Sequence, residues 1–137
     1  MLRLDDIMSA KSKGTNAERE VIHMFWKNGW AALRCAGSGS IRYPVPDIVA
    51  GNNLRHIAIE CKSTSAERQY ISKKEISDLL EFANLFGCEA WIGVRFDGGK
   101  WYFFSCEDLK ETENSFVIGL AEASLKGLLF EEMIRTG

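Results

Sequence analysis

Two acidic side chains and one amine occur at a spacing that could bring them together on neighbouring strands. Asp47 follows Pro46 at the start of a β-branched run, and Glu60 and Lys62 lie in the alternating segment 56–62. Because side chains alternate across a strand, Glu60 and Lys62 share a face and lie roughly 7 Å apart. Paired carboxylates can bind a hard cation such as Mg²⁺ and leave positions for water and a phosphate oxygen. The ammonium could then orient the attacking water or stabilise charge on the phosphorus oxygens.

Each of these fragments also has an ordinary structural interpretation. A Glu-x-Lys pair on an alternating strand is commonly a solvated face with a weak ion pair, and Pro-Asp commonly opens a turn. The combination favours a site, because twelve residues separate Asp47 from Glu60 and a predicted hairpin turn joins the two strands. We therefore interpret Asp47, Glu60 and Lys62 as candidate metal-binding and catalytic residues.

Glu18 is a candidate third carboxylate near the start of the first predicted helix. A capping box with Thr15 as N-cap and Glu18 at N3 would by itself explain this acid. An acid in the first turn of a helix that packs on the sheet can also reach a metal site. Lys11, Lys13 and Arg19 place positive charge at the same helix end, where they could contact DNA, although solvation alone would also explain them.

A loop rich in serine and glycine precedes Asp47. Segment 36–46 contains glycines and prolines that favour an exposed connection, and the phosphate-binding motif G-x-x-x-x-G-K-[ST] is absent from the sequence. A flexible linker would explain this composition. The hydroxyls and the guanidinium of the loop could instead clamp a DNA backbone, and they belong to Ser38, Ser40, Arg42 and Tyr43.

The surrounding pattern predicts the elements that would position these residues. Apolar residues at helical spacing predict helices over 16–28 and 72–86, each followed by glycine, and a terminal helix over 124–135. A loosely held arm is predicted over residues 1–12, followed by a single domain over 13–137. Strands are predicted over 30–35, 47–51, 55–62, 88–94, 100–105 and 116–118, with a helical turn over 107–111. This order favours a layered α/β domain with a mixed sheet.

The charge distribution along the chain bears on the class of partner. The chain has 137 residues, 46% of them hydrophobic, which suits one compact domain. Its net charge of -2 taken alone argues against a protein that binds polyanions. Residues 1–74, however, contain 12 basic and 7 acidic side chains, a net +5, whereas residues 75–137 contain 5 and 12, a net -7. The candidate residues all lie in the basic half, which favours a polyanion-facing surface there.

The remaining composition argues against several other classes. The four cysteines are widely spaced without a C-x-x-C pair, so a zinc site or a disulfide framework is disfavoured; they are Cys35, Cys61, Cys88 and Cys106. No apolar run of about 18 residues predicts a membrane span, and the first residues do not resemble a secretory signal. We therefore expect a cytoplasmic protein.

Several segments of this chain match a known family in order along the sequence. They are Lys13–Glu20, Ala36–Ser40, Pro46–Ala50, Ile59–Ser63 and Leu80–Ala83. With these segments the chain, from about Lys13 to its end, resembles the archaeal Holliday-junction resolvases of the PD-(D/E)XK, restriction-endonuclease-like superfamily. The resemblance implies a central mixed β-sheet flanked by helices. It also implies a Mg²⁺-dependent endonuclease, with Mn²⁺ able to substitute, that makes paired symmetric nicks across four-way DNA junctions in recombination and repair.

The resemblance also implies roles for individual residues. It assigns metal binding to three acids and catalysis to a lysine and a loop serine: Glu18, Asp47, Glu60, Lys62 and Ser38. Arg19 corresponds to a basic residue near the DNA. Two departures are visible, because a lead containing Asp5 and Asp6 precedes the family-like start, and Cys61 occupies a position where Val or Met is more familiar.

The resemblance further implies a homodimer that associates with the nucleoid, with a sliding clamp or a recombination helicase as a recruiting partner. A dimer also has independent support, because two symmetric nicks are most simply made by two sites related by a twofold axis. An apolar tail could form this interface or pack in its own core; it contains Leu125, Leu128, Leu129, Phe130, Met133 and Ile134. Two alternatives stay open: a related nuclease with another DNA substrate, and a junction-binding protein without catalysis.

Overall fold

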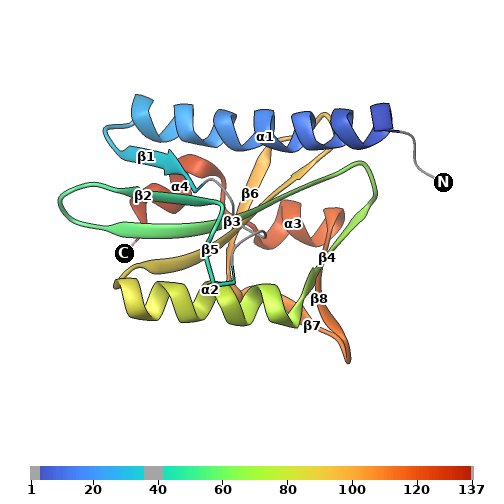
Figure 1. Ribbon diagram of the computed structural model, residues 1–137. Coiled ribbons are helices and arrows are strands. Elements are labelled where there is room, and N and C mark those ends of the chain that lie inside the picture. Colours follow the sequence, from blue (N-terminus) through green and yellow to red (C-terminus); the bar gives the residue numbers. More distant parts are fainter. Residues whose placement is uncertain (1–3, 36–41, 137) are drawn as a thin grey trace.

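A five-stranded mixed sheet forms the middle of the molecule (Figure 1). The computed structural model describes residues 4–35 and 42–136, with side chains from Asn16 onward. In spatial order the strands are β1 (Ala31–Arg34), β2 (Ile48–Gly51), β3 (His56–Thr64), β5 (Glu89–Phe96) and β6 (Trp101–Ser105). Strands β3 and β5 are parallel and the other neighbours are antiparallel. The predicted α/β class with a mixed sheet is therefore confirmed.

Helices cover both faces of this sheet, with α1 and α2 on opposite sides (Figure 1). Their bounds are α1 (Leu4–Lys27), α2 (Lys73–Phe86), α3 (Leu120–Lys126) and α4 (Phe130–Arg135). Within the described residues, no helix is long and apolar enough to cross a membrane.

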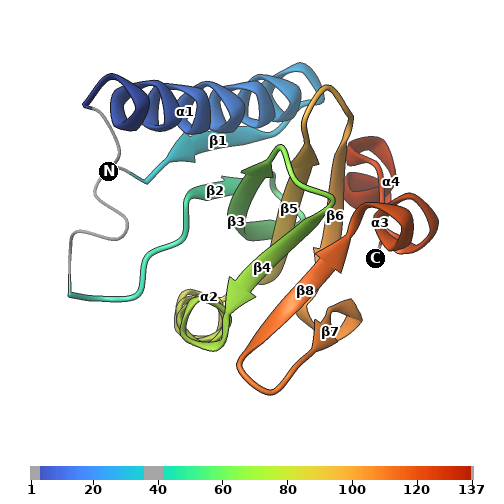
Figure 2. The ribbon, with the colours of Figure 1, turned by 90° about the vertical axis from the view of Figure 1, so that its right-hand side faces the viewer.

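A second, smaller sheet lies beside α2 (Figure 2). It has the order β4 (Arg68–Ser72), β8 (Ser115–Gly119) and β7 (Lys110–Glu111), and the 3-10 helix η1 (Cys106–Asp108) precedes β7. Strand β4 connects the end of β3 to the start of α2. This sheet was not predicted, because β4 is short and polar except for the buried Ile71.

The alternation predicted for β3 divides the core into two apolar clusters. Ile57 and Ile59 face α1, where Ala17, Val21 and Phe25 recur every four residues and are buried. The opposite face of β3 meets α2 through Ala58, and that cluster also contains Ile76, Leu79, Ala83, Ile92 and Val94. Glu60 and Lys62 lie two and four residues after Ala58 on β3. They therefore share its face, which is the face covered by α2.

The predicted hairpin that contains Asp47 and Glu60 is confirmed. Strands β2 and β3 pair antiparallel with Ile48 opposite Ile59, and the Asn52 side chain accepts the backbone N–H groups of Leu54 and Arg55 in the turn. The predicted helix over 72–86 is confirmed as well.

Two predictions about the first helix are wrong, namely its starting residue and its capping box. Helix α1 begins at Leu4 rather than at Asn16, so Thr15 lies inside the helix and the predicted capping box does not form. Segment 4–15 contains no proline, and the single Gly14 costs a helix only about 1 kcal/mol. The boundary predicted between residues 12 and 13 falls within this continuous helix.

The chain beyond residue 120 forms two short helices in place of the single predicted one. Between them, Leu128 forms an isolated bridge with Phe103, and its N–H donates to the Phe103 carbonyl. Phe130 and Met133 are buried in the cluster that faces α1. Of the two alternatives for the apolar tail, packing within its own core is therefore the one observed for these residues.

Candidate active site

Backbone pairing fixes Asp47 at the point where β2 begins. Its N–H donates to the carbonyl of Ile59 at 3.1 Å, and its carbonyl accepts the N–H of Cys35 at 2.8 Å. Its carboxylate oxygen Oδ2 accepts the N–H of Cys61 at 2.8 Å. Main chain and side chain are thus both attached to the neighbouring strand, and the carboxylate is oriented before any ligand binds.

Glu60 lies beside this carboxylate, and the two carboxyl groups are in hydrogen-bond contact. Burial raises the pKa of Glu60 to about 9, and the hydrogen bond and the charge of Asp47 act in the same direction. The metal-free pair therefore holds a proton at neutral pH. A divalent cation would replace this proton and remove the repulsion between the two acids.

The donor set of this pair fits a hard cation. Mg²⁺ is commonly held by one or two carboxylates, while water and phosphate oxygens complete its coordination. Among the described residues, no group of three or more His, Cys, Asp or Glu side chains is arranged to hold a metal. Asp47 and Glu60 are thus the residues that would hold Mg²⁺, and a third carboxylate from Glu18 stays a prediction.

Lys62 lies on the same face as Glu60, as the alternation predicted. Its Nζ is 2.6 Å from Oε2 of Glu75, in the first turn of α2. Both side chains are partly buried, with exposed fractions of 25% for Lys62 and 37% for Glu75. The ammonium is close enough to the acidic pair to favour the ionised form of Glu60.

Glu18 approaches the site from α1 but is paired with an arginine. Nε of Arg34, the last residue of β1, donates to Oε2 of Glu18 at 2.7 Å. Burial raises the pKa of Glu18, the hydrogen bond from Arg34 opposes this shift, and the charge of Asp47 raises the pKa again. The effect of Asp47 places Glu18 near the acidic pair.

The structure describes the remaining predicted site residues only in part. Ser38 and Ser40 lie outside the described residues, and Lys11 and Lys13 lie in α1 within the part whose side chains are not described. Arg19 and Arg42 are exposed, and the Arg42 guanidinium carbon lies 5.6 Å from the ring centroid of Tyr43. Their proposed contacts with DNA stay predictions.

Sequence reasoning missed two residues at this site, Arg34 and Glu75. Arg34 lies near the end of a predicted strand beside the serine loop, which was a weak signal. Glu75 follows Ser72 at capping-box spacing, a pattern that by itself indicates only a local role. Only the packing of helices on strands shows that these side chains contact Glu18 and Lys62.

Two acids and a lysine on adjacent strands of a mixed sheet, with helices on both faces, define a PD-(D/E)XK-type protein of the restriction-endonuclease-like fold. The structure of Archaeoglobus fulgidus Hjc, described as a Holliday junction resolvase from an archaeal hyperthermophile, matches with a TM-score of 0.82 and 39% sequence identity. The match covers 87% of this chain and 96% of that one. The family description "Archaeal holliday junction resolvase (hjc)" matches residues 9–137, and the chain belongs to this family.

Curated relatives agree with this assignment. The crossover junction endodeoxyribonuclease Hjc of Archaeoglobus fulgidus is 42% identical over 129 residues, which cover 89% of this chain and 95% of the relative. Hjc of Sulfolobus acidocaldarius is 32% identical over 93% of this chain and 90% of its own length. Hje of the same organism is 35% identical over 73% of this chain and 74% of its own length. The family and fold expected from the resemblance are therefore confirmed.

Proposed function

We propose that this chain is a structure-selective endonuclease that resolves four-way DNA junctions by metal-dependent hydrolysis of phosphodiester bonds. Family membership and relatives named crossover junction endodeoxyribonuclease support the substrate class. The observation that supports hydrolysis by this chain itself is the contact between the Asp47 and Glu60 carboxyl groups beside Lys62. These are the groups that phosphoryl transfer with a divalent cation requires.

In this proposal each residue contributes through its own position. Asp47 and Glu60 hold Mg²⁺, or Mn²⁺ in its place, and Glu18 joins them when its carboxylate is released from Arg34. The bound ion supplies charge that stabilises the phosphate oxygens and lowers the pKa of water. The Lys62 ammonium positions the attacking water and donates to the phosphate as negative charge develops.

Contacts with the DNA backbone are assigned to basic and hydroxyl side chains around this site. Ser38, in the loop before Asp47, is proposed to act close to the scissile phosphate. The residues proposed to position the backbone are Lys11, Lys13, Arg19, Ser38, Ser40 and Arg42. Backbone contacts of this kind fix register without reading sequence, which suits recognition of a junction by its shape.

We propose further that the active form is a homodimer joined through one flank of α2. Phe82, Leu85 and Phe86 fall on this flank, with Leu85 79% and Phe86 61% exposed. The rings of Phe82 and Phe86 stack with centroids 5.0 Å apart, and with Tyr43 and Pro44 they line a shallow apolar pocket. Exposed apolar patches on a small domain indicate an interface. A second copy is the occupant that would also supply the second site needed for paired nicks.

The test compares cleavage of a synthetic four-way junction with cleavage of a linear duplex of the same sequence in Mg²⁺. We expect the junction to be nicked preferentially, and we expect Asp47→Asn and Glu60→Gln proteins to bind the junction without nicking it. Equal cutting of both DNAs would instead identify a related nuclease with another substrate. Wild-type protein that binds junctions but is inert in both Mg²⁺ and Mn²⁺ would identify a junction-binding protein without catalysis.

A further inference from the structure

Glu75 makes a contact that its position in the helix does not require. Its Oε2 lies 2.6 Å from Nζ of Lys62, so the pair connects the first turn of α2 to β3. This oxygen is buried and accepts no hydrogen bond within the described part of the chain, so the Lys62 ammonium compensates it as a charge in an ion pair. A buried carboxylate oxygen is costly unless a cation compensates it, so the two side chains depend on each other.

The local sequence would allow a different use of this glutamate. Ser72 and Glu75 have the spacing of a capping box, in which an N3 glutamate turns back to the N-cap backbone. Half of that motif forms, because the Ser72 hydroxyl accepts the N–H of Glu75 at 3.0 Å. The Glu75 side chain, however, is directed across to Lys62. The cap therefore fixes the backbone of Glu75 and leaves its carboxylate to act on the neighbouring strand.

The surroundings of Lys62 explain what such a contact does. Lysine is a point charge on a flexible stem, and it takes its place only where a partner holds it. The Asp47–Glu60 pair is close enough to Lys62 to attract its ammonium as well. An ammonium drawn onto that pair would occupy the position where a divalent cation binds. Glu75 attracts the ammonium from the side of α2. Lys62 therefore stays beside the acidic pair and leaves the cation position between the two carboxylates unoccupied.

We propose that Glu75 is a positioning residue that holds the Lys62 ammonium at the site and keeps the Asp47–Glu60 pair open for the cation. This inference rests on the proposed function and extends it to a residue on a second structural element. Glu75 acts only through Lys62, so removing its charge affects the reaction step more than it affects junction binding.

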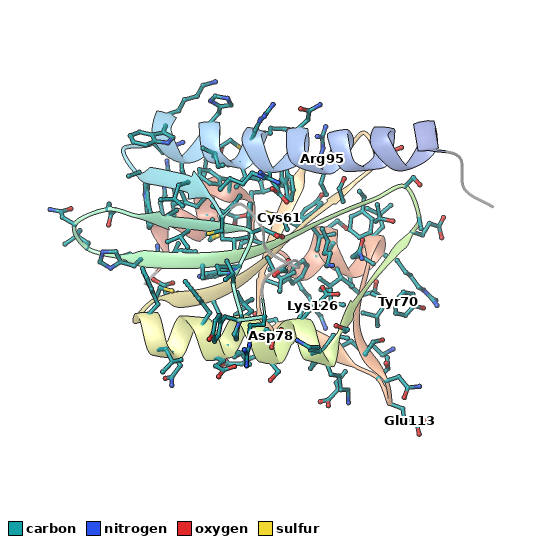
Figure 3. All side chains as sticks on the ribbon, viewed as in Figure 1. Cys61, Tyr70, Asp78, Arg95, Glu113 and Lys126 are labelled. Carbon is teal, nitrogen blue, oxygen red and sulfur yellow. The ribbon has the colours of Figure 1, made fainter. Side chains whose placement is uncertain are left out.

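The experiment measures single-turnover nicking of a four-way junction by the full chain and by a Glu75→Gln protein. Asp78→Asn is the matched control, because Asp78 lies one turn further along α2 (Figure 3). Its carboxylate pairs with the exposed Lys74 at 2.7 Å. We expect Glu75→Gln to lower the rate constant about tenfold to a hundredfold, since a misplacement of about 1 Å can cost roughly a hundredfold. Its junction Kd stays within about twofold, and Asp78→Asn stays near wild type.

A double-mutant cycle separates positioning from a merely structural role. In a Lys62→Ala background, we expect Glu75→Gln to cause no further loss of rate, measured over long incubations at high protein concentration. An equal loss in both backgrounds, or a Glu75→Gln protein as fast as wild type, would overturn the inference. If the wild-type protein itself fails to nick junctions, the proposed function fails first, and this result is distinct from either.

A second measurement does not depend on activity. The side-chain ammonium of Lys62, observed by ¹H–¹⁵N NMR in the metal-free protein, is expected to be protected from solvent exchange in wild type and in Asp78→Asn. In Glu75→Gln we expect the signal to change its chemical shift, because the ammonium moves from Glu75 towards the Asp47–Glu60 pair. A Lys62 signal that is unchanged in the Glu75→Gln protein would contradict the positioning role.

Discussion

The carboxyl group of Asp47, at the start of β2, lies close enough to the Glu60 carboxyl group on the antiparallel strand β3 to raise its pKa. Burial acts in the same direction and brings the pKa of Glu60 to about 9, so the metal-free pair holds a proton at neutral pH. If the proposed cation binds here, it would replace this proton. Stability, metal binding and pH would then be linked at this site.

The first prediction concerns stability in the absence of metal. In the unfolded chain Glu60 ionises near the ordinary glutamate pKa of 4.5, but its folded pKa is about 9. Between these values the folded state binds more protons, so the contribution of Glu60 to the free energy of unfolding falls as pH rises, by at most about 1.4 kcal/mol per pH unit. A Glu60→Gln protein should lack this slope. Urea unfolding of both proteins in EDTA at pH 5 to 8 measures the difference, and parallel curves would contradict it.

Metal binding should release a proton. When Mg²⁺ or Mn²⁺ binds, Glu60 must ionise, so affinity for the metal should increase with pH between 6 and 8. Calorimetric titration in buffers with different ionisation enthalpies measures the number of protons released. The Glu60→Gln protein has no proton to release here and serves as the control. Equal proton release by the two proteins would show that Glu60 is not the group displaced.

The proposed dimer predicts that a charge on α2 separates the protomers. A Leu85→Glu protein should elute as a monomer in size-exclusion chromatography with light scattering, because the substitution places a carboxylate in an apolar interface. Leu125, on α3 and 85% exposed, gives a matched control, and Leu125→Glu should stay dimeric. A Leu85→Glu dimer, or a Leu125→Glu monomer, would move the interface away from α2.

The Ser72 cap should link helix stability to catalysis. Replacing Ser72 with Ala removes the bond to the Glu75 N–H and should lower the free energy of unfolding by about 1 kcal/mol. The nicking rate should fall as well, because the backbone of Glu75 is no longer fixed by the cap and its carboxylate no longer holds Lys62 in place. Ser77, exposed in the same helix, provides the control substitution Ser77→Ala, which we expect to be close to neutral in both measurements. A Ser72→Ala protein with wild-type stability would show that the cap contributes little.

Gly93 on β5 should not tolerate a side chain. A Cβ there would lie 2.9 Å from Cε1 of Phe103, whose ring is fully buried. We expect Gly93→Ala to lower the free energy of unfolding by about 1–3 kcal/mol, the usual cost of overpacking. The smaller side chain in a Gly93→Ala, Phe103→Leu double variant should restore part of this loss. Chemical denaturation of wild type, of the Gly93→Ala and Phe103→Leu single variants and of the double variant measures this, and additive losses in the double variant would contradict a direct clash.

Local patterns predicted much of the site. Asp47, Glu60 and Lys62 were recognisable because alternation and a tight turn determine both the face and the partner strand of a hairpin. Helix α2 was predicted almost to the residue, since Ser72 caps its start and Gly87, at φ 82°, ends it. These signals act over a few residues and depend little on the rest of the fold.

The contacts that were missed join side chains on different elements. Strands β3 and β5 pair in parallel across the whole of α2, and no pattern within either strand specifies that partner. The contact of Glu75 with Lys62 follows from the packing of α2 on β3, and the contact of Arg34 with Glu18 follows from the packing of α1 on β1. The early start of α1 has another cause, because the capping pattern at Thr15 competes with helix propensity on both sides of it and does not prevail.

The bond from the Cys61 N–H to the Asp47 carboxylate has a consequence for observing the site. The Asp47 side chain accepts the Cys61 N–H in place of a main-chain carbonyl. Protection of the Cys61 amide against deuterium exchange therefore depends on the orientation of Asp47, a proposed metal ligand. The exchange rate at Cys61, compared with that of Ile59 in the regular ladder, would report whether Asp47 keeps its orientation or turns when a cation or a junction binds. The amide of Cys61 is thus a reporter, already present in the chain, of the carboxylate proposed to bind the metal.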